Sequence, residues 1–156
     1  MRNPGFAQDP MDFLPIFLDI RAQPCLVVGG GKIAARKTAL LLRAGGRVTV
    51  LSPALIPAFD DYLAQGKVTH RTASFSAGDV TEYALVIAAT DDDSVNREVA
   101  AAAQARRIPV NVVDQPALCS FILPSIIDRS PVIVAVSSGG ASPVLARLLR
   151  ARLETL

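Results

Sequence analysis

Short apolar runs alternate along the chain with segments in which apolar residues recur every three or four positions. The runs predict β-strands and the periodic segments predict amphipathic helices. Strands are predicted at Pro24 to Val28, Arg47 to Leu51, Val68 to Arg71, Ala84 to Ala88, Pro109 to Val113 and Pro131 to Val136. Helices are predicted between them, at Lys32 to Ala44, Leu55 to Gln65 and Asp92 to Arg106. This alternation predicts an α/β fold in which helices cover both faces of a parallel sheet.

The pattern changes after Asp114. The next segment contains the short apolar run Phe121 to Leu123, which predicts a strand outside the alternating series. A last helix is predicted from about Pro143 to the end, with Ser142 as its N-cap. Because the sequence stops inside this helix without a C-cap glycine, we expect a domain of a longer protein.

Composition excludes several classes of protein. Hydrophobic residues make up 51% of the chain and charged residues 19%, with 16 basic against 14 acidic side chains and a formal charge of +2. A disordered chain has fewer hydrophobic residues than this, and a protein that coats nucleic acid has a larger positive charge, so the composition excludes both classes. Two cysteines and one histidine are too few for a disulfide framework or a cluster of Cys and His metal ligands, so we expect neither. No apolar run reaches the ~18 residues of a spanning helix, and no signal peptide opens the chain, so we expect a cytoplasmic protein without a membrane partner.

The first predicted strand runs into a glycine-rich turn, Gly29-Gly30-Gly31-Lys32-Ile33-Ala34, and then into a helix. The order G-x-G-x-x-A is typical of a dinucleotide-binding turn: Gly29 makes the tight turn and Gly31 lets the backbone approach a pyrophosphate. The free N–H groups at the start of the helix favour the anion. A glycine-rich turn that binds nothing is the alternative, but the order strand, turn, helix favours a Rossmann-like nucleotide site.

The end of the second predicted strand lacks the acidic residue that usually holds the ribose hydroxyls. It reads Leu51-Ser52-Pro53-Ala54, without an arginine for a 2′-phosphate. The Ser52 hydroxyl is expected to donate a weaker hydrogen bond in place of the carboxylate. The sequence therefore favours NAD over NADP only slightly.

The loop after the fourth predicted strand contains Thr90, Asp91, Asp92 and Asp93. Ligands bind at the carboxyl ends of the strands in such folds, so Thr90 and Asp91 are candidates for lining the site. A helix cap with a solvated acidic turn is an equally good interpretation of Asp92 and Asp93.

Asp114 ends the fifth predicted strand at the same edge. Such a residue can cap the following turn, or it can transfer a proton if a substrate lies beside the cofactor, and the residues alone leave both roles open.

A second candidate segment, Ser137-Ser138-Gly139-Gly140, joins a strand to a helix. It predicts either a loop that binds an anion or a turn with a serine N-cap. His70 is expected to lie far from these loops and has no assigned role. Cys119 is expected to serve packing.

Five segments taken together resemble the N-terminal dehydrogenase and ferrochelatase part of sirohaem synthase. They are GGGKIAARK, AATDDDSVN, NVVDQP, SFILPSIIDRSP and VAVSSGGASPVLARLLR, and the resemblance covers residues 11–156. It implies NAD-dependent oxidation of precorrin-2 to sirohydrochlorin, and in bifunctional members insertion of ferrous iron to give sirohaem. It also implies a homodimer, in which residues 11–114 bind NAD and residues 115–156 form a dimerisation segment and the start of a helical module. Residues 1–10 are expected to be a disordered extension.

The resemblance and the positions at the strand ends together give the expected roles of individual residues. Asp114 corresponds to the catalytic aspartate of the family. Expected cofactor contacts are Gly29, Gly30, Gly31, Lys32, Ile33, Ser52, Pro53, Ala54, Thr90 and Asp91. Expected substrate contacts are Asn111, Ser137, Ser138, Gly139 and Gly140. The alternative function is a non-catalytic NAD(H)-sensing or dimerisation module of a larger protein.

Overall fold

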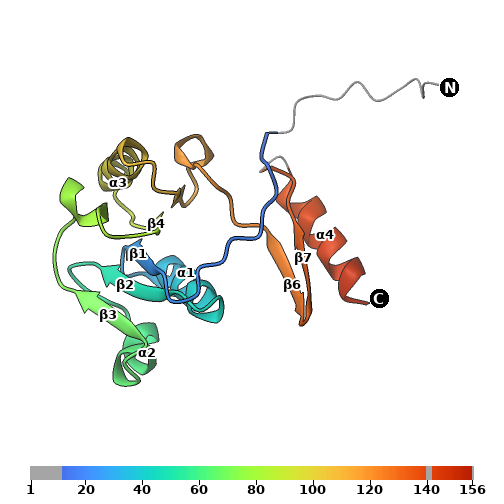
Figure 1. Cartoon of the computed structure of the whole chain (residues 1–156), viewed down its shortest axis with the longest axis horizontal. Helices are drawn as coiled ribbons and strands as arrows, with labels where there is room; N and C mark the ends of the chain where they lie inside the picture. Colours follow the sequence, from blue (N-terminus) through green and yellow to red (C-terminus); the bar gives the residue numbers. More distant parts are fainter. Residues whose placement is uncertain (1–11, 140–141, 156) are drawn as a thin grey trace. The chain divides into compact units, whose positions relative to one another are not determined.

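The computed structural model describes residues 12–139 and 142–155. The chain divides into two compact units, which Figure 1 shows in colours that follow the sequence. One unit runs from Asp19 to Ile122. The other combines the segment that ends at Leu18 with the segment that begins at Leu123.

The larger unit is built on a five-stranded parallel sheet in the order β3-β2-β1-β4-β5. The strands are β1 (Pro24–Val28), β2 (Arg47–Leu51), β3 (Val68–Arg71), β4 (Leu85–Ala88) and β5 (Val110–Val112). In the register of the central strands, Cys25 lies opposite Val48 of β2 and Leu85 of β4. The α/β fold predicted from the sequence is confirmed.

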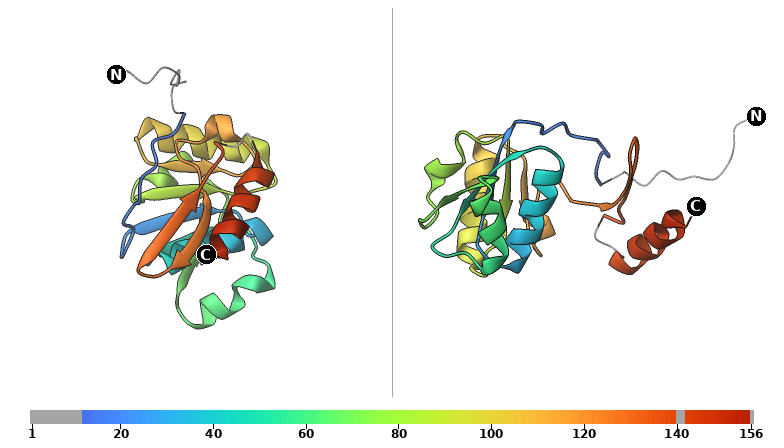
Figure 2. Two further views of the ribbon diagram at one scale, coloured as in Figure 1. Left: turned by 90° about the vertical axis from the view of Figure 1, so that its right-hand side faces the viewer. Right: turned by 90° about the horizontal axis from the view of Figure 1, so that it is seen from below.

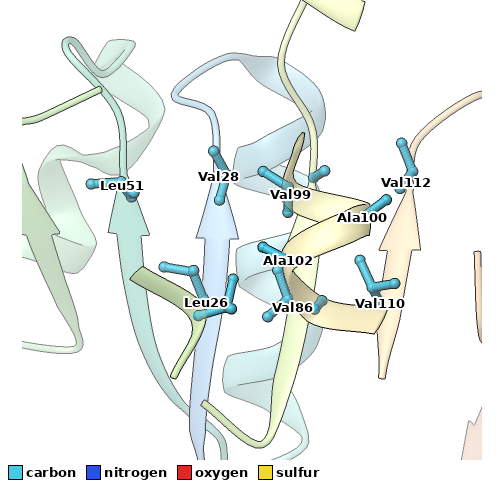
Figure 3. Close-up of a cluster of buried hydrophobic side chains, with 12 residues drawn as sticks. Leu26, Val28, Leu51, Val86, Val99, Ala100, Ala102, Val110 and Val112 are labelled. Atoms are coloured by element: carbon cyan, nitrogen blue, oxygen red, sulfur yellow. The ribbon is translucent and has the colours of Figure 1, made fainter. Parts of the chain in front are cut away.

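Two long helices cover opposite faces of this sheet, as Figure 3 shows. The first, α1 (Lys32–Arg43), contacts β1 and β2, and α3 (Asp93–Ala105) contacts β4 and β5. The core on the α3 side joins strand residues such as Val86 and Val110 to Val99 and Ala103 of the helix, all at 0% exposure. Alanines on α3 let its backbone approach the sheet closely, because they bring little side-chain volume to the interface.

The helix predicted at Leu55 to Gln65 is wrong over its first half. The structure has a 3₁₀ turn, η1 (Pro57–Phe59), followed by the short helix α2 (Asp60–Ala64). Pro57 cannot donate a backbone hydrogen bond and so stands at a helix start, which delays the α-helix to Asp60. Two further 3₁₀ turns, η2 (Ala77–Val80) and η3 (Pro116–Leu118), precede β4 and follow β5.

The smaller unit contains an antiparallel hairpin and one helix. Strands β6 (Ser125–Arg129) and β7 (Val132–Val136) pair with each other, and α4 (Pro143–Glu154) packs mainly on β6 (Figure 2). The strand predicted at Phe121 to Leu123 is wrong, since the strand begins only at Ser125. Pro124 has no N–H to donate to a ladder, so pairing starts after it.

No helix in the two described ranges is both long enough and apolar enough to cross a bilayer.

Candidate dinucleotide site

A cleft of about 980 Å³ lies at the carboxyl edge of the parallel sheet. All five strands send loops to it. Its lining residues are 28–33, 51–53, 73–75, 89–93, 95, 96 and 113–115. The larger unit supplies all of them, so every lining residue belongs to the unit from Asp19 to Ile122. Binding at this edge is typical of open parallel sheets.

The three glycines of the turn after β1 have different surroundings. A Cβ atom on Gly29, whose φ is +120°, would overlap the carbonyl oxygen of Ala89. A Cβ atom on Gly30 would overlap the carbonyl oxygen of Ala54. Gly31 meets nothing within 4 Å at the same position. The first two glycines therefore pack the turn between neighbouring loops, and only Gly31 leaves open space in the cleft.

The open space at Gly31 fits the phosphates of a dinucleotide. Gly31 is the N-cap of α1, its φ of −88° is ordinary extended backbone, and no side chain caps the helix there. The first turn of any α-helix has N–H groups without a partner inside the helix. The first turn of α1 contains no acidic residue and begins with Lys32, so its field attracts an anion.

The loop after β2 differs in one respect from the sequence-based expectation. Ser52 is only 7% exposed, and its hydroxyl donates to the carbonyl oxygen of Ala54 at 2.7 Å. In this structure the loop uses the single proton of the Ser52 hydroxyl, but Ser52 lines the cleft, and its contact with the cofactor stays a prediction. Pro53 lines the cleft, whereas Ala54 holds the loop through its carbonyl group.

His70 lies closer to this loop than we expected. Its Nε2 atom is 2.9 Å from the carbonyl oxygen of Ser52, so the expectation that His70 is remote from the ligand-binding loops is wrong. The loop after β3 also reaches the cleft through Ala73, Ser74 and Phe75, which sequence reasoning did not select. Their position directly after a parallel strand was a signal that could have identified them.

The loop after β4 is held by Asn96, a second residue that sequence reasoning missed. Asn96 is 2% exposed, and its Nδ2 atom donates to the carbonyl oxygen of Thr90 at 3.0 Å. The Thr90 hydroxyl lies 2.9 Å from the Asn96 Oδ1 atom, so the two side chains fix the loop that carries Thr90 and Asp91 into the cleft. The amide of Asn96 thus links α3 by hydrogen bonds to the loop that follows β4.

Asp92 and Asp93 have separate roles. The Asp92 carboxylate caps α3 by accepting from the backbone N–H groups of Ser94 at 2.8 Å and Val95 at 3.3 Å. The hydroxyl and N–H of Ser94, together with the N–H of Val95, lower the pKa of Asp92. Asp93 instead accepts a hydrogen bond from the Gln115 side chain across the cleft edge, at 2.6 Å.

Asp114 lies at the end of β5 and lines the cleft. Its side chain is exposed, and its φ of +58° is left-handed, a conformation that Asp and Asn tolerate better than most residues. On α1, burial and the neighbouring Arg36 lower the pKa of Lys37, while the carboxylate of Asp114 opposes that shift. The half-buried Lys37 is therefore a positive charge within electrostatic range of Asp114.

Two residues near Asp114 hold the structure together instead of facing the cleft. Asn111 is 7% exposed, and its amide donates to the carbonyl oxygen of Phe121 at 3.1 Å. It does not line the cleft. The Cys119 sulfur accepts from the N–H of Val112 at 3.1 Å, which agrees with a packing role.

The serine- and glycine-rich segment lies in the smaller unit, between β7 and α4. Ser137 accepts from the N–H of Gly139 at 3.1 Å, and Ser138 accepts from the N–H of Ser142 at 3.0 Å. Ser142 caps α4 as predicted, accepting from the N–H of Leu145. Gly140 lies outside the described residues. In the part of the chain that is described, no three His, Cys, Asp or Glu side chains are grouped as metal ligands.

Comparison with known proteins gives the family. Residues 16–125 match the family model described as "Putative NAD(P)-binding". The chain belongs to this NAD(P)-binding family. Residues 130–156 match a second model, described as "Sirohaem biosynthesis protein central". The nicotinamide dinucleotide predicted from the glycine turn is confirmed by this membership.

The relatives support the same assignment. The NAD(P)-binding chain is 60% identical over 146 residues to a siroheme synthase of Methylobacillus flagellatus and 61% identical over 146 residues to one of Nitrosococcus oceani. Each match covers 94% of this chain and 31% of the relative, so the chain spans about a third of these proteins.

A solved structure described as SirC, precorrin-2 dehydrogenase, is similar with a TM-score of 0.81 at 25% identity, covering 92% of this chain and 70% of that one. The resemblance to sirohaem synthase stated from the sequence is confirmed.

Proposed function

We propose that this chain is an NAD-dependent precorrin-2 dehydrogenase, the part of a sirohaem synthase that oxidises precorrin-2 to sirohydrochlorin. The observation that carries the proposal is the cleft itself. It joins the open N-terminus of α1 at Gly31 to the exposed carboxylate of Asp114. Siroheme synthases at about 60% identity and the precorrin-2 dehydrogenase neighbour support the choice of substrate.

Each part of the cleft has a role in this reaction. Gly31, Lys32 and the first turn of α1 bind the pyrophosphate, and the loops at Pro53 and Thr90 border the rest of the cofactor. When bound, NAD supplies a hydride acceptor. Dehydrogenation also releases a proton, and Asp114 accepts it, since its carboxylate is exposed in the cleft and makes no hydrogen bond of its own within the described chain.

The same carboxylate provides a route to a second activity. Insertion of ferrous iron into sirohydrochlorin releases pyrrole protons, and Asp114 is the acceptor we propose for them. Iron is here a substrate. Ser137, Ser138, Gly139, Gly140 and Asn111 remain our predicted contacts for the macrocycle and its carboxylates, and Asp91 a predicted cofactor contact.

We also propose that residues 115–156 form a dimerisation segment. The described part of α4 exposes five large apolar side chains, each at least 38% accessible: Val144, Leu145, Leu148, Leu149 and Leu153. Apolar groups of this number favour burial in an interface. Sedimentation of the chain at micromolar concentration is expected to show about twice 16.4 kDa, and a monomer would contradict the dimer. A cytoplasmic location stays a prediction, which cell fractionation tests.

The decisive experiment mixes the complete protein with precorrin-2 and NAD. We expect NADH absorbance and the sirohydrochlorin spectrum to appear together, and sirohaem after ferrous iron is added. NAD binding without turnover would instead favour a redox sensor, the alternative function.

A further inference from the structure

The direction of the Asp114 side chain depends largely on its backbone, and Lys37 acts on it only as a nearby charge. Its carboxylate makes no side-chain hydrogen bond within the described ranges, so its direction depends on the segment from Val113 to Gln115. On the strand side that segment is fixed, because the N–H of Val113 donates to the carbonyl oxygen of Ala88 in β4 at 3.0 Å. On the other side of Asp114, the N–H of Gln115 donates to the carbonyl oxygen of Val112 at 3.3 Å and closes the turn.

The side chain of Gln115 adds a further restraint, which links this turn to another element. Its Nε2 atom donates to the Oδ1 atom of Asp93 at 2.6 Å. Asp93 is the first residue of α3, a helix whose buried face, including Val99 and Ala103, packs into the core. The bond therefore connects the turn that carries Asp114 to a rigid element.

The bond also joins two walls of the cleft. Asp93 and Gln115 both line it, Asp93 from the loop after β4 and Gln115 from the loop after β5. The backbone of Gln115 supports η3 as well, since its carbonyl oxygen accepts from the N–H of Leu118 at 3.0 Å. Breaking the side-chain bond leaves these backbone contacts in place and releases only the link to α3.

We propose that Gln115, held by Asp93, is a positioning residue that sets the direction of Asp114 relative to the dinucleotide site. This rests on the proposed dehydrogenase function. Displacing a catalytic group by about 1 Å costs on the order of 10²-fold in rate, so one bond at this place affects turnover more than stability. Gly31 belongs to the turn after β1 and takes no part in this bond, so we expect cofactor binding there to persist.

Exchanging the two partners tests the proposal in the complete protein. Gln115→Glu places two carboxylates against each other and breaks the bond. The double variant Asp93→Asn with Gln115→Glu restores a hydrogen bond with donor and acceptor reversed and keeps the net charge. Gln65→Glu, at an exposed residue after α2, is the control for added charge.

We expect Gln115→Glu to lower kcat about 10- to 100-fold while the Kd for NAD changes less than about twofold. The double variant is expected to return kcat to within about threefold of wild type, and Gln65→Glu to leave it unchanged. Gln115→Ala removes the bond without adding a charge and is also expected to lower kcat. It therefore tests the proposal even if Gln115→Glu does not fold.

Two results would overturn the positioning role. One is an unchanged kcat in folded Gln115→Glu and Gln115→Ala. The other is a double variant that folds and binds NAD but stays as slow as Gln115→Glu. If the wild-type protein binds NAD and does not oxidise precorrin-2, the dehydrogenase function itself fails, and the positioning role fails with it.

Discussion

Replacement of Gly31 by valine separates cofactor binding from folding. Gly31 has a φ of −88° and a ψ of −172°, which valine adopts without strain, and no atom lies within 4 Å of the added Cβ. The folding cost is therefore that of a poor N-cap residue, about 1 kcal/mol. The new side chain instead fills the space in which the pyrophosphate would lie.

The expected effect on binding is large. Loss of the close approach between backbone and phosphate should weaken NAD at least ~100-fold, which corresponds to about 2.7 kcal/mol. Calorimetric titration with NAD measures this loss, and thermal unfolding checks that the variant is folded.

Gly78 supplies a matched control for this experiment. It also has nothing within 4 Å of an added Cβ, and it lies in η2, outside the cleft lining. Gly78→Val should bind NAD as wild type does. If folded Gly31→Val keeps its NAD affinity within about threefold, the turn after β1 is not the cofactor site.

Three further variants test the packing and the charges. Gly30→Ala would overlap a backbone carbonyl in the loop after β2, so we expect it to lower the free energy of unfolding by about 1–3 kcal/mol in denaturant titration. The Thr38 hydroxyl is fully buried and has no partner in the described chain, so Thr38→Val should gain about 1 kcal/mol, or roughly 2–4 °C in Tm. Burial raises the pKa of Asp79, but hydrogen bonds from a capping N–H and from Arg71 outweigh it and lower the pKa overall. Asp79→Asn should therefore have a lower Tm than wild type at neutral pH, and this gap should close as the pH falls below about 4, through the lowered pKa.

The central strands β1 and β4 could be predicted from sequence because they are buried on both faces and form continuous apolar runs. β1, β2 and β3 begin and end at the predicted residues. Strand β6 was not predicted, and the two wrongly placed elements both involve proline. The side chains around Pro57 follow a helical pattern, and those before Pro124 form the apolar run of a strand. Regular hydrogen bonding fails at both places because proline has no N–H group.

The candidate site was predictable where it depends on strand ends. Gly31, Thr90 and Asp114 line the cleft because parallel strands finish at one edge. Asn96 could not be identified, since its role depends on a tertiary contact from α3 to the Thr90 loop. The link from Gln115 to Asp93 likewise joins residues 22 positions apart, and no local pattern indicates it.

The most direct test of the account measures precorrin-2 oxidation by Asp114→Asn in the complete protein. Asparagine tolerates the left-handed φ of +58° and removes only the charge and the basic oxygen. We predict that NADH formation falls ~10²- to 10⁴-fold, while NAD affinity and Tm stay near those of wild type. Asp114→Asn that oxidises precorrin-2 at the wild-type rate would contradict the central claim that this carboxylate accepts the proton.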